Sequence, residues 1–150
     1  MDYKDLDYLS FLFFKRFSVL ENCLLPNYVK LRNGNVIGLN WDGYAEDTNL
    51  ITCIEHDEYK QSVKYLCEYP PKRLAKNDED FKWIVSNESI DVNSANLIKA
   101  LTQLRHNLFH GAKYTGATYD DPERTKRLLV EGNTVLKFIL SSQFSTKIDL

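Results

Sequence analysis

Residues 93–110 read NSANLIKALTQLRHNLFH and form the clearest helical pattern in the sequence. Leu97, Leu101, Leu104 and Leu108 recur at spacings of three and four residues, which is the repeat of one face of an α-helix. An apolar stripe of this kind packs against other elements of a core. The stretch therefore predicts a helix that is buried along its leucines.

The side of this helix opposite the leucines is polar. It carries Lys99, Gln103, His106 and His110, and Arg105 lies on the shoulder between the two sides. On an ideal helix Arg105 and His110 point about 140° apart. A glycine follows His110 at once, so we expect the helix to end there and to leave the imidazole at a rim.

Helical patterns also account for most of the remaining chain. Apolar spacing predicts a helix over residues 5–25 that Pro26 ends. Three more are expected: from about Trp41 with Asn40 as cap, over about 55–69 before two prolines, and from an Asp121-Pro122-Glu123 start to about Phe144. A turn at Asn33-Gly34 predicts a short hairpin within residues 28–39, residues 70–92 are expected to form a loop with a short element, and residues 111–120 a loop. The prediction is an all-α bundle of four or five helices in a single domain, residues 1–150.

The first helix is apolar nearly all round. Tyr8, Phe11, Leu12, Phe14 and Val19 lie off its main stripe. A helix of this kind is normally buried on more than one side. Either it is the central helix of one chain, or its second side meets another subunit.

Composition and charge limit the classes of function. With 43% hydrophobic and 27% charged residues the chain has the composition of a globular domain, and its net charge of −2 excludes broad binding to nucleic acid phosphates. Cys23, Cys53 and Cys67 show neither metal-site nor disulfide-framework spacing. The acidic start lacks the basic region of a signal peptide, and the apolar run over residues 9–14 is too short to cross a bilayer. We expect a cytoplasmic protein with no membrane contact.

The segment over residues 105–110, RHNLFH, carries residue types that suit RNA cleavage. Histidine can take or give a proton near neutral pH, and arginine can hold a phosphate and neutralise charge that develops on it. Arg105 and His110 are the candidate catalytic residues, with His106 and Asn107 as supporting residues that orient them. Since no carboxylate cluster lies nearby in the sequence, we expect neither a metal nor another cofactor.

Simpler interpretations of the same residues stay open. Arginine and histidine are common on a polar helical face, and the R-x4-H spacing also arises by chance in a helical scaffold. His110 could equally interact with the negative end of the helix dipole.

The RHNLFHG run over residues 105–111 resembles the R-x4-6-H motif of HEPN domains (higher eukaryotes and prokaryotes nucleotide-binding), with His106 at the place of their polar residue after the arginine. Residues 14–21, FKRFSVLE, resemble the first helix of small bacterial HEPN-like proteins. Further similar landmarks are Trp41-Asp42, residues 69–72 and residues 121–124, so that the resemblance spans about residues 10–140.

The resemblance implies a homodimer in which Arg105 and His110 of different chains form one ribonuclease site. Such enzymes cleave RNA without a metal, leave a 2′,3′-cyclic phosphate, and often act as toxins or antiphage effectors with a cognate antitoxin or defence partner. Toxins paired with a nucleotidyltransferase antitoxin carry a tyrosine two residues after the motif histidine, whereas the first tyrosine here is Tyr114. The alternative is a non-catalytic HEPN module that dimerises and binds a partner protein or a nucleotide.

Overall fold

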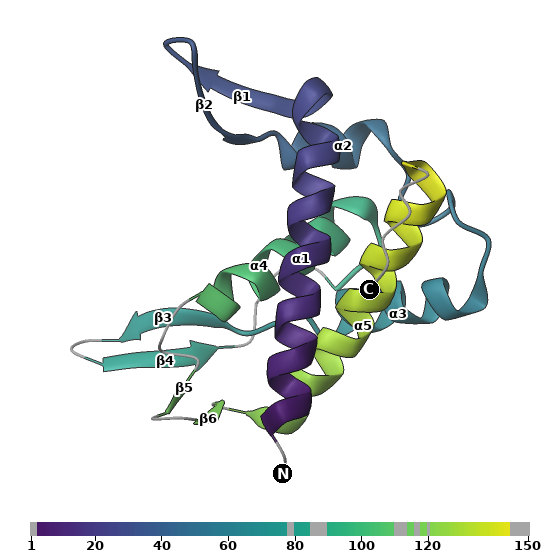
Figure 1. Ribbon diagram of the computed structural model, residues 1–150. Helices are drawn as coiled ribbons and strands as arrows, with labels where there is room; N and C mark the ends of the chain where they lie inside the picture. The colour runs from purple at the N-terminus through teal and green to yellow at the C-terminus, as the bar shows by residue number, and fades with distance from the viewer. Residues whose placement is uncertain are drawn as a thin grey trace.

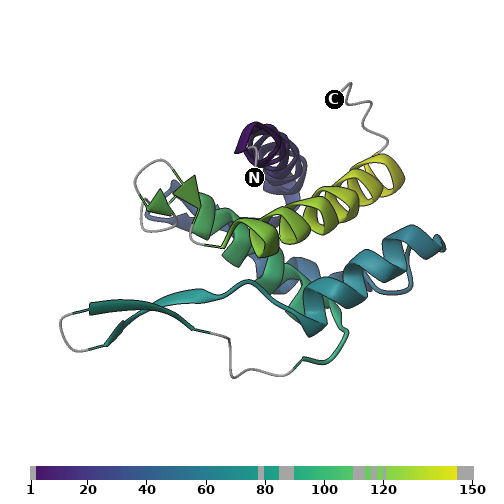
Figure 2. The same cartoon turned by 90° about the horizontal axis from the view of Figure 1, so that it is seen from below.

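Two long helices, α1 (Tyr3–Tyr28) and α5 (Pro122–Gln143), lie side by side and organise the fold (Figure 1). The computed structural model describes residues 3–77, 80–84, 90–109, 114–115, 118–119 and 121–144. The helices in these residues are α1 (Tyr3–Tyr28), α2 (Trp41–Asp47), α3 (Asp57–Glu68), α4 (Ser94–Phe109) and α5 (Pro122–Gln143). Seen from below, α5 lies between α1 and α3 (Figure 2). The expected helical bundle is confirmed.

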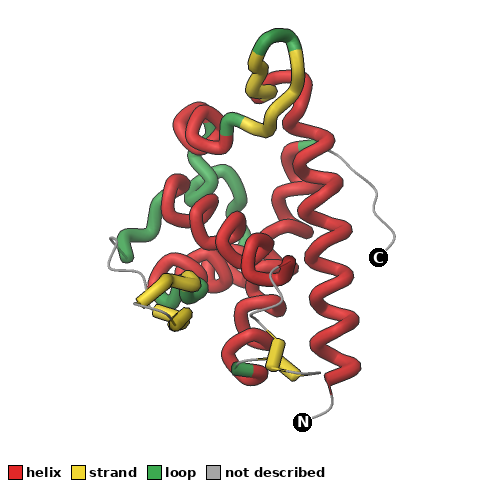
Figure 3. Tube along the Cα trace, turned by 90° about the vertical axis from the view of Figure 1, so that its left-hand side faces the viewer, coloured by secondary structure: helices red, strands yellow, loops and turns green. Residues whose placement is uncertain are grey.

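Short antiparallel hairpins extend from the edges of this helical body (Figure 3). They pair β1 (Val29–Arg32) with β2 (Asn35–Leu39), β3 (Arg73–Asn77) with β4 (Asp80–Ile84), and β5 (Tyr114–Thr115) with β6 (Thr118–Tyr119). The predicted hairpin within residues 28–39 is confirmed. Its turn places Asn33 at φ 52° and Gly34 at φ 80°, the left-handed conformations that a two-residue hairpin turn requires.

Two details differ from the sequence prediction. The prediction that Pro26 ends the first helix is wrong, because α1 continues to Tyr28 with the proline inside its last turn. The proline removes only one helical hydrogen bond, because it lacks only its own N–H donor. At the end of the helix, the Tyr28 carbonyl accepts a hydrogen bond of 2.7 Å from the Asn40 amide. The hairpin β3–β4 lies in residues 70–92, where a short element was expected, whereas β5–β6 lies in residues 111–120, which were expected to form a loop.

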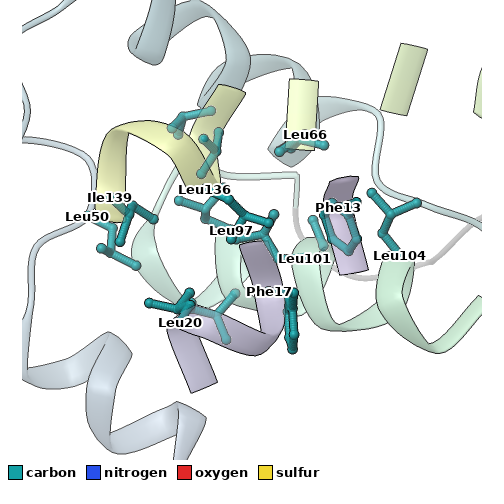
Figure 4. Packing of buried hydrophobic residues seen from close by; sticks show 14 of the residues in the cluster. Phe13, Phe17, Leu20, Leu50, Leu66, Leu97, Leu101, Leu104, Leu136 and Ile139 are labelled. Atoms are coloured by element: carbon teal, nitrogen blue, oxygen red, sulfur yellow. The ribbon is translucent and has the colours of Figure 1, made fainter. Parts of the chain in front are cut away.

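The core lies where α1, α4 and α5 meet, and Figure 4 shows Phe13 of α1 beside Leu101 and Leu104 of α4. Three of the four leucines of the predicted stripe are buried, and Leu108 is half-buried. The labelled residues in Figure 4 are Phe13, Phe17, Leu20, Leu50, Leu66, Leu97, Leu101, Leu104, Leu136 and Ile139. The buried leucines therefore determine which side of α4 faces the core.

Within one chain, α1 is covered on one side only. Tyr8, Phe11 and Phe14 are exposed, while Leu12 and Val19 are half-buried. The apolar excess of α1 is therefore not used up by packing within this chain.

No helix in the described part of the chain is long and apolar enough to cross a membrane.

Side-chain caps begin the helices where the sequence places them. The Asn40 carboxamide oxygen accepts a hydrogen bond of 3.0 Å from the Gly43 amide at the start of α2. The Asp121 carboxylate accepts one of 3.3 Å from the Arg124 amide at the start of α5. Both predicted caps are confirmed.

We expect Asp121→Ala to lower the free energy of unfolding by about 1 kcal/mol, because it removes the acceptor for a backbone N–H at the start of α5. Thermal unfolding measures the loss. Asp121→Asn is the matched control, since asparagine caps a helix about as well as aspartate. An unchanged melting temperature in Asp121→Ala would contradict the role of this cap.

Candidate functional site

The start of α4 is anchored to the loop after α2. The Asn93 side chain accepts a hydrogen bond of 2.8 Å from the Asn96 amide. The Ser94 hydroxyl accepts one of 2.8 Å from the Leu50 amide and donates one of 3.1 Å to the Thr48 carbonyl. Together with the buried leucines, these bonds fix which side of α4 faces α1.

Arg105 lies in the groove between α4 and α1. Its guanidinium carbon is 5.1 Å from the ring centre of Phe17 and 4.9 Å from that of Phe109, both within the range of a cation–π contact. Its Nη2 atom is 3.4 Å from Oε1 of Glu21 on α1. The side chain is 36% exposed, so two rings and one carboxylate hold a cation that still reaches solvent.

One atom of Arg105 has an unmet bonding need. Its Nε is buried and has no hydrogen-bond partner among the described residues. A buried donor without a partner costs free energy, because it has lost water without a replacement. The guanidinium is thus positioned mainly by ring faces rather than by a full set of hydrogen bonds.

The other predicted site residues lie on different sides of α4. His106 is exposed, next to Arg105 in the chain. Asn107 is buried, donates a hydrogen bond of 2.7 Å to the Lys72 carbonyl and accepts one of 2.7 Å from Gln103. It therefore ties the end of α4 to the segment before β3. His110 lies outside the described residues.

The residues that surround Arg105 were not predicted as site residues. Phe17 belongs to the apolar stripe of α1, and Glu21 follows it by one helical turn. A carboxylate at the edge of an apolar stripe is a weak signal, because many such residues face water. Only the crossing of α1 and α4 turns Glu21 into the partner of Arg105.

The Glu21 carboxylate is in an unfavourable environment for its charge. Burial raises the pKa of Glu21 above its ordinary value of 4.5, and the positive charge of Arg105 opposes that increase. Desolvation is the larger of the two effects. The ion pair is thus a weak one, in keeping with its 3.4 Å separation and its partial exposure.

The described surroundings of Arg105 offer no cluster of metal ligands. Among the described residues, no group of three or more such side chains could hold a metal ion. All three cysteines, Cys23, Cys53 and Cys67, are among the described residues and form no disulfide. The chemistry that the described site offers is that of a cation, aromatic rings and one carboxylate.

We expect the free energy of unfolding of the wild type, compared with that of Glu21→Gln, to be more favourable at low pH than at neutral pH. A pKa raised in the folded state means that folding favours the protonated carboxyl, so this stabilisation is present below about pH 4.5 and is lost as the pH rises through the folded-state value. Urea unfolding of both proteins at about pH 4 and about pH 7 measures it. Glu46→Gln on the exposed side of α2 controls for the loss of one negative charge. A difference that grows toward neutral pH would show that the ion pair with Arg105 outweighs desolvation.

No protein-family model, curated protein or solved structure matches this chain. The HEPN resemblance therefore stays an expectation that is carried by the motif residues. The site itself consists of Arg105 in a groove between two helices, with aromatic rings and Glu21 around it.

Proposed function

We propose that this protein is a metal-independent endoribonuclease of the HEPN type that acts as a homodimer. The observation that carries the proposal is the position of Arg105. Its guanidinium is partly exposed in a groove, on the same helix as the exposed His106 and five residues before His110. A positioned guanidinium at the surface is what recognition of an RNA phosphate needs.

The reaction assigned to the site is an internal transfer of the phosphate. The 2′-hydroxyl of a ribose attacks the adjacent phosphorus, and its proton passes to a base, for which we assign His110. The bond to the 5′ oxygen breaks and that oxygen takes up a proton, which leaves a 2′,3′-cyclic phosphate and a 5′-hydroxyl. Arg105 neutralises the negative charge that develops on the phosphate in the transition state.

A homodimer would allow these two residues to act together. On an ideal helix they point about 140° apart, so one chain's Arg105 is better placed to work with the other chain's His110. The exposed Tyr8 of α1 adds apolar area of the kind that subunit interfaces bury. We assign to this interface the face of α4 that carries His106, which an ideal helix would extend to His110.

The setting we propose is the cytoplasm, where RNA is the substrate and thiols stay reduced. In that setting a small ribonuclease of this kind acts as a toxin or antiphage effector. A cognate antitoxin or a defence partner would then control it.

The alternative is a non-catalytic module that dimerises and binds a partner protein or a nucleotide. The contact that favours it is the ion pair of Arg105 with Glu21, because that carboxylate occupies part of the guanidinium. Exposed pairs contribute only about 0–1 kcal/mol, so a phosphate can displace Glu21. Measured cleavage separates the two functions.

We expect Arg105→Ala and His110→Ala each to abolish RNA cleavage while the protein stays folded. Loss of a general base or acid typically costs about 10²–10⁴-fold in rate, and loss of the guanidinium removes charge stabilisation. Arg105 is partly exposed, so its truncation opens no large core cavity. Cleavage of single-stranded RNA in EDTA, with analysis of the 3′ ends for cyclic phosphate, is the measurement.

Arg127→Ala is the matched control, because it removes a partly exposed arginine of α5 that likewise contacts a ring and a carboxylate, and it should cleave like the wild type. Mixing the two inactive variants should restore some activity, because a heterodimer regains one intact pair of residues. Activity that disappears in EDTA and returns with Mg²⁺, or full activity in His110→Ala, would falsify the assignment.

We also expect a dimer in solution. Sedimentation over a wide concentration range measures it, and the dimer should dissociate only on dilution. A strict monomer at high concentration would exclude the shared site, although it would leave Arg105 available to bind a phosphate within one chain.

A further inference from the structure

Beside Arg105, the groove between α1 and α4 widens into a pocket of about 200 Å³. Phe11 and Phe14 of α1 form one wall, and Leu108 and Phe109 of α4 form the other. Arg105 also lines this pocket. An apolar cavity of about 150 Å³ holds a benzene molecule, so this pocket has room for one flat ring system.

The pocket walls are aromatic rings that remain open to solvent. Phe11 is 64% exposed, Phe14 41% and Phe109 56%. The rings of Phe14 and Phe109 meet edge to face, with centres 5.3 Å apart and planes at 72°. Exposed phenylalanines that gather around a hollow leave apolar surface in water, and such patches commonly mark binding sites.

We propose that this pocket stacks one nucleobase of the RNA strand and places the adjacent phosphate at Arg105. This inference rests on the proposed function, because it names the part of the substrate that the same site holds. Proteins that bind single-stranded RNA stack unpaired bases on aromatic side chains and on arginine. A nucleotide combines one flat ring with an anionic group close by, which matches a pocket that is lined by aromatic rings and one cation.

A second copy of the chain fits this pocket less well. An apolar side chain that filled it would take the partly exposed guanidinium of Arg105 out of water without giving it a new anion. The pocket side of α4, marked by Arg105 and Phe109, also points about 100° away from the side marked by His106 and His110 on an ideal helix. A dimer formed through the latter side therefore leaves the pocket open.

The test uses a short single-stranded RNA that carries 2′-O-methyl groups at every position and one 2-aminopurine. The methyl groups prevent attack by the 2′ oxygen, so binding is measured without cleavage, and stacking lowers the fluorescence of 2-aminopurine. The wild type should bind this RNA and quench it. Phe109→Leu keeps apolar volume but removes the ring face, and should bind about 5- to 150-fold more weakly, the usual effect of one lost base stack.

Phe109→Trp should retain both the affinity and the quenching, because it keeps a ring to stack on. Tyr69→Leu is the matched control: it likewise replaces an exposed aromatic ring by leucine, outside the pocket, and should behave like the wild type. Wild-type affinity and quenching in Phe109→Leu would overturn the proposal. A Phe109→Leu protein that loses its dimer but binds RNA unchanged would assign the pocket to a second copy instead.

The same measurements separate this proposal from the proposed function. Quenching that depends on Phe109, together with no cleavage of unmodified RNA, would leave the base pocket standing and exclude the nuclease. Cleavage by both the wild type and Phe109→Leu at equal rates, with equal affinity, would leave the nuclease standing and exclude the pocket.

Discussion

The three longest helices meet at a glycine. Gly132 of α5 is buried, and a Cβ atom there would lie 2.9 Å from Cε2 of Phe13 on α1 and 3.1 Å from Cδ2 of Leu104 on α4. The next residue, Asn133, accepts a hydrogen bond of 2.9 Å through its carbonyl from Nη1 of Arg16. The lack of space at Gly132, with the hydrogen bond beside it, sets how closely α1 and α4 approach α5, and so how these two helices lie beside each other.

The close approach creates the groove in which the candidate site lies. Because α4 is fixed by its buried leucines, Arg105 meets Phe17 and Glu21 on α1, and Phe109 meets Phe14. The rings exclude water from one side of the guanidinium and leave the other side open. A cation in that position is held in place yet can exchange a weakly bound carboxylate for a phosphate.

The proposed functions share this physical basis. The ribonuclease proposal uses the charge of Arg105, and the base pocket uses the ring faces beside it. Glu21 competes with the substrate in both proposals, since a phosphate that binds Arg105 must displace this carboxylate, which is itself poorly solvated. The two proposals together favour an anion that offers both a phosphate and a flat ring over a simple anion.

The sequence by itself determined the helices, the first hairpin and the caps, because these depend on neighbours three or four residues apart or on turn residues such as Asn33-Gly34. It also singled out Arg105 on the polar shoulder of its helix. Only the tertiary structure decided that Glu21 and Phe17 surround Arg105, and that Phe14 and Phe109 form a pocket. These contacts join residues more than eighty positions apart, and their geometry follows from the angle at which two helices cross, which no local pattern encodes.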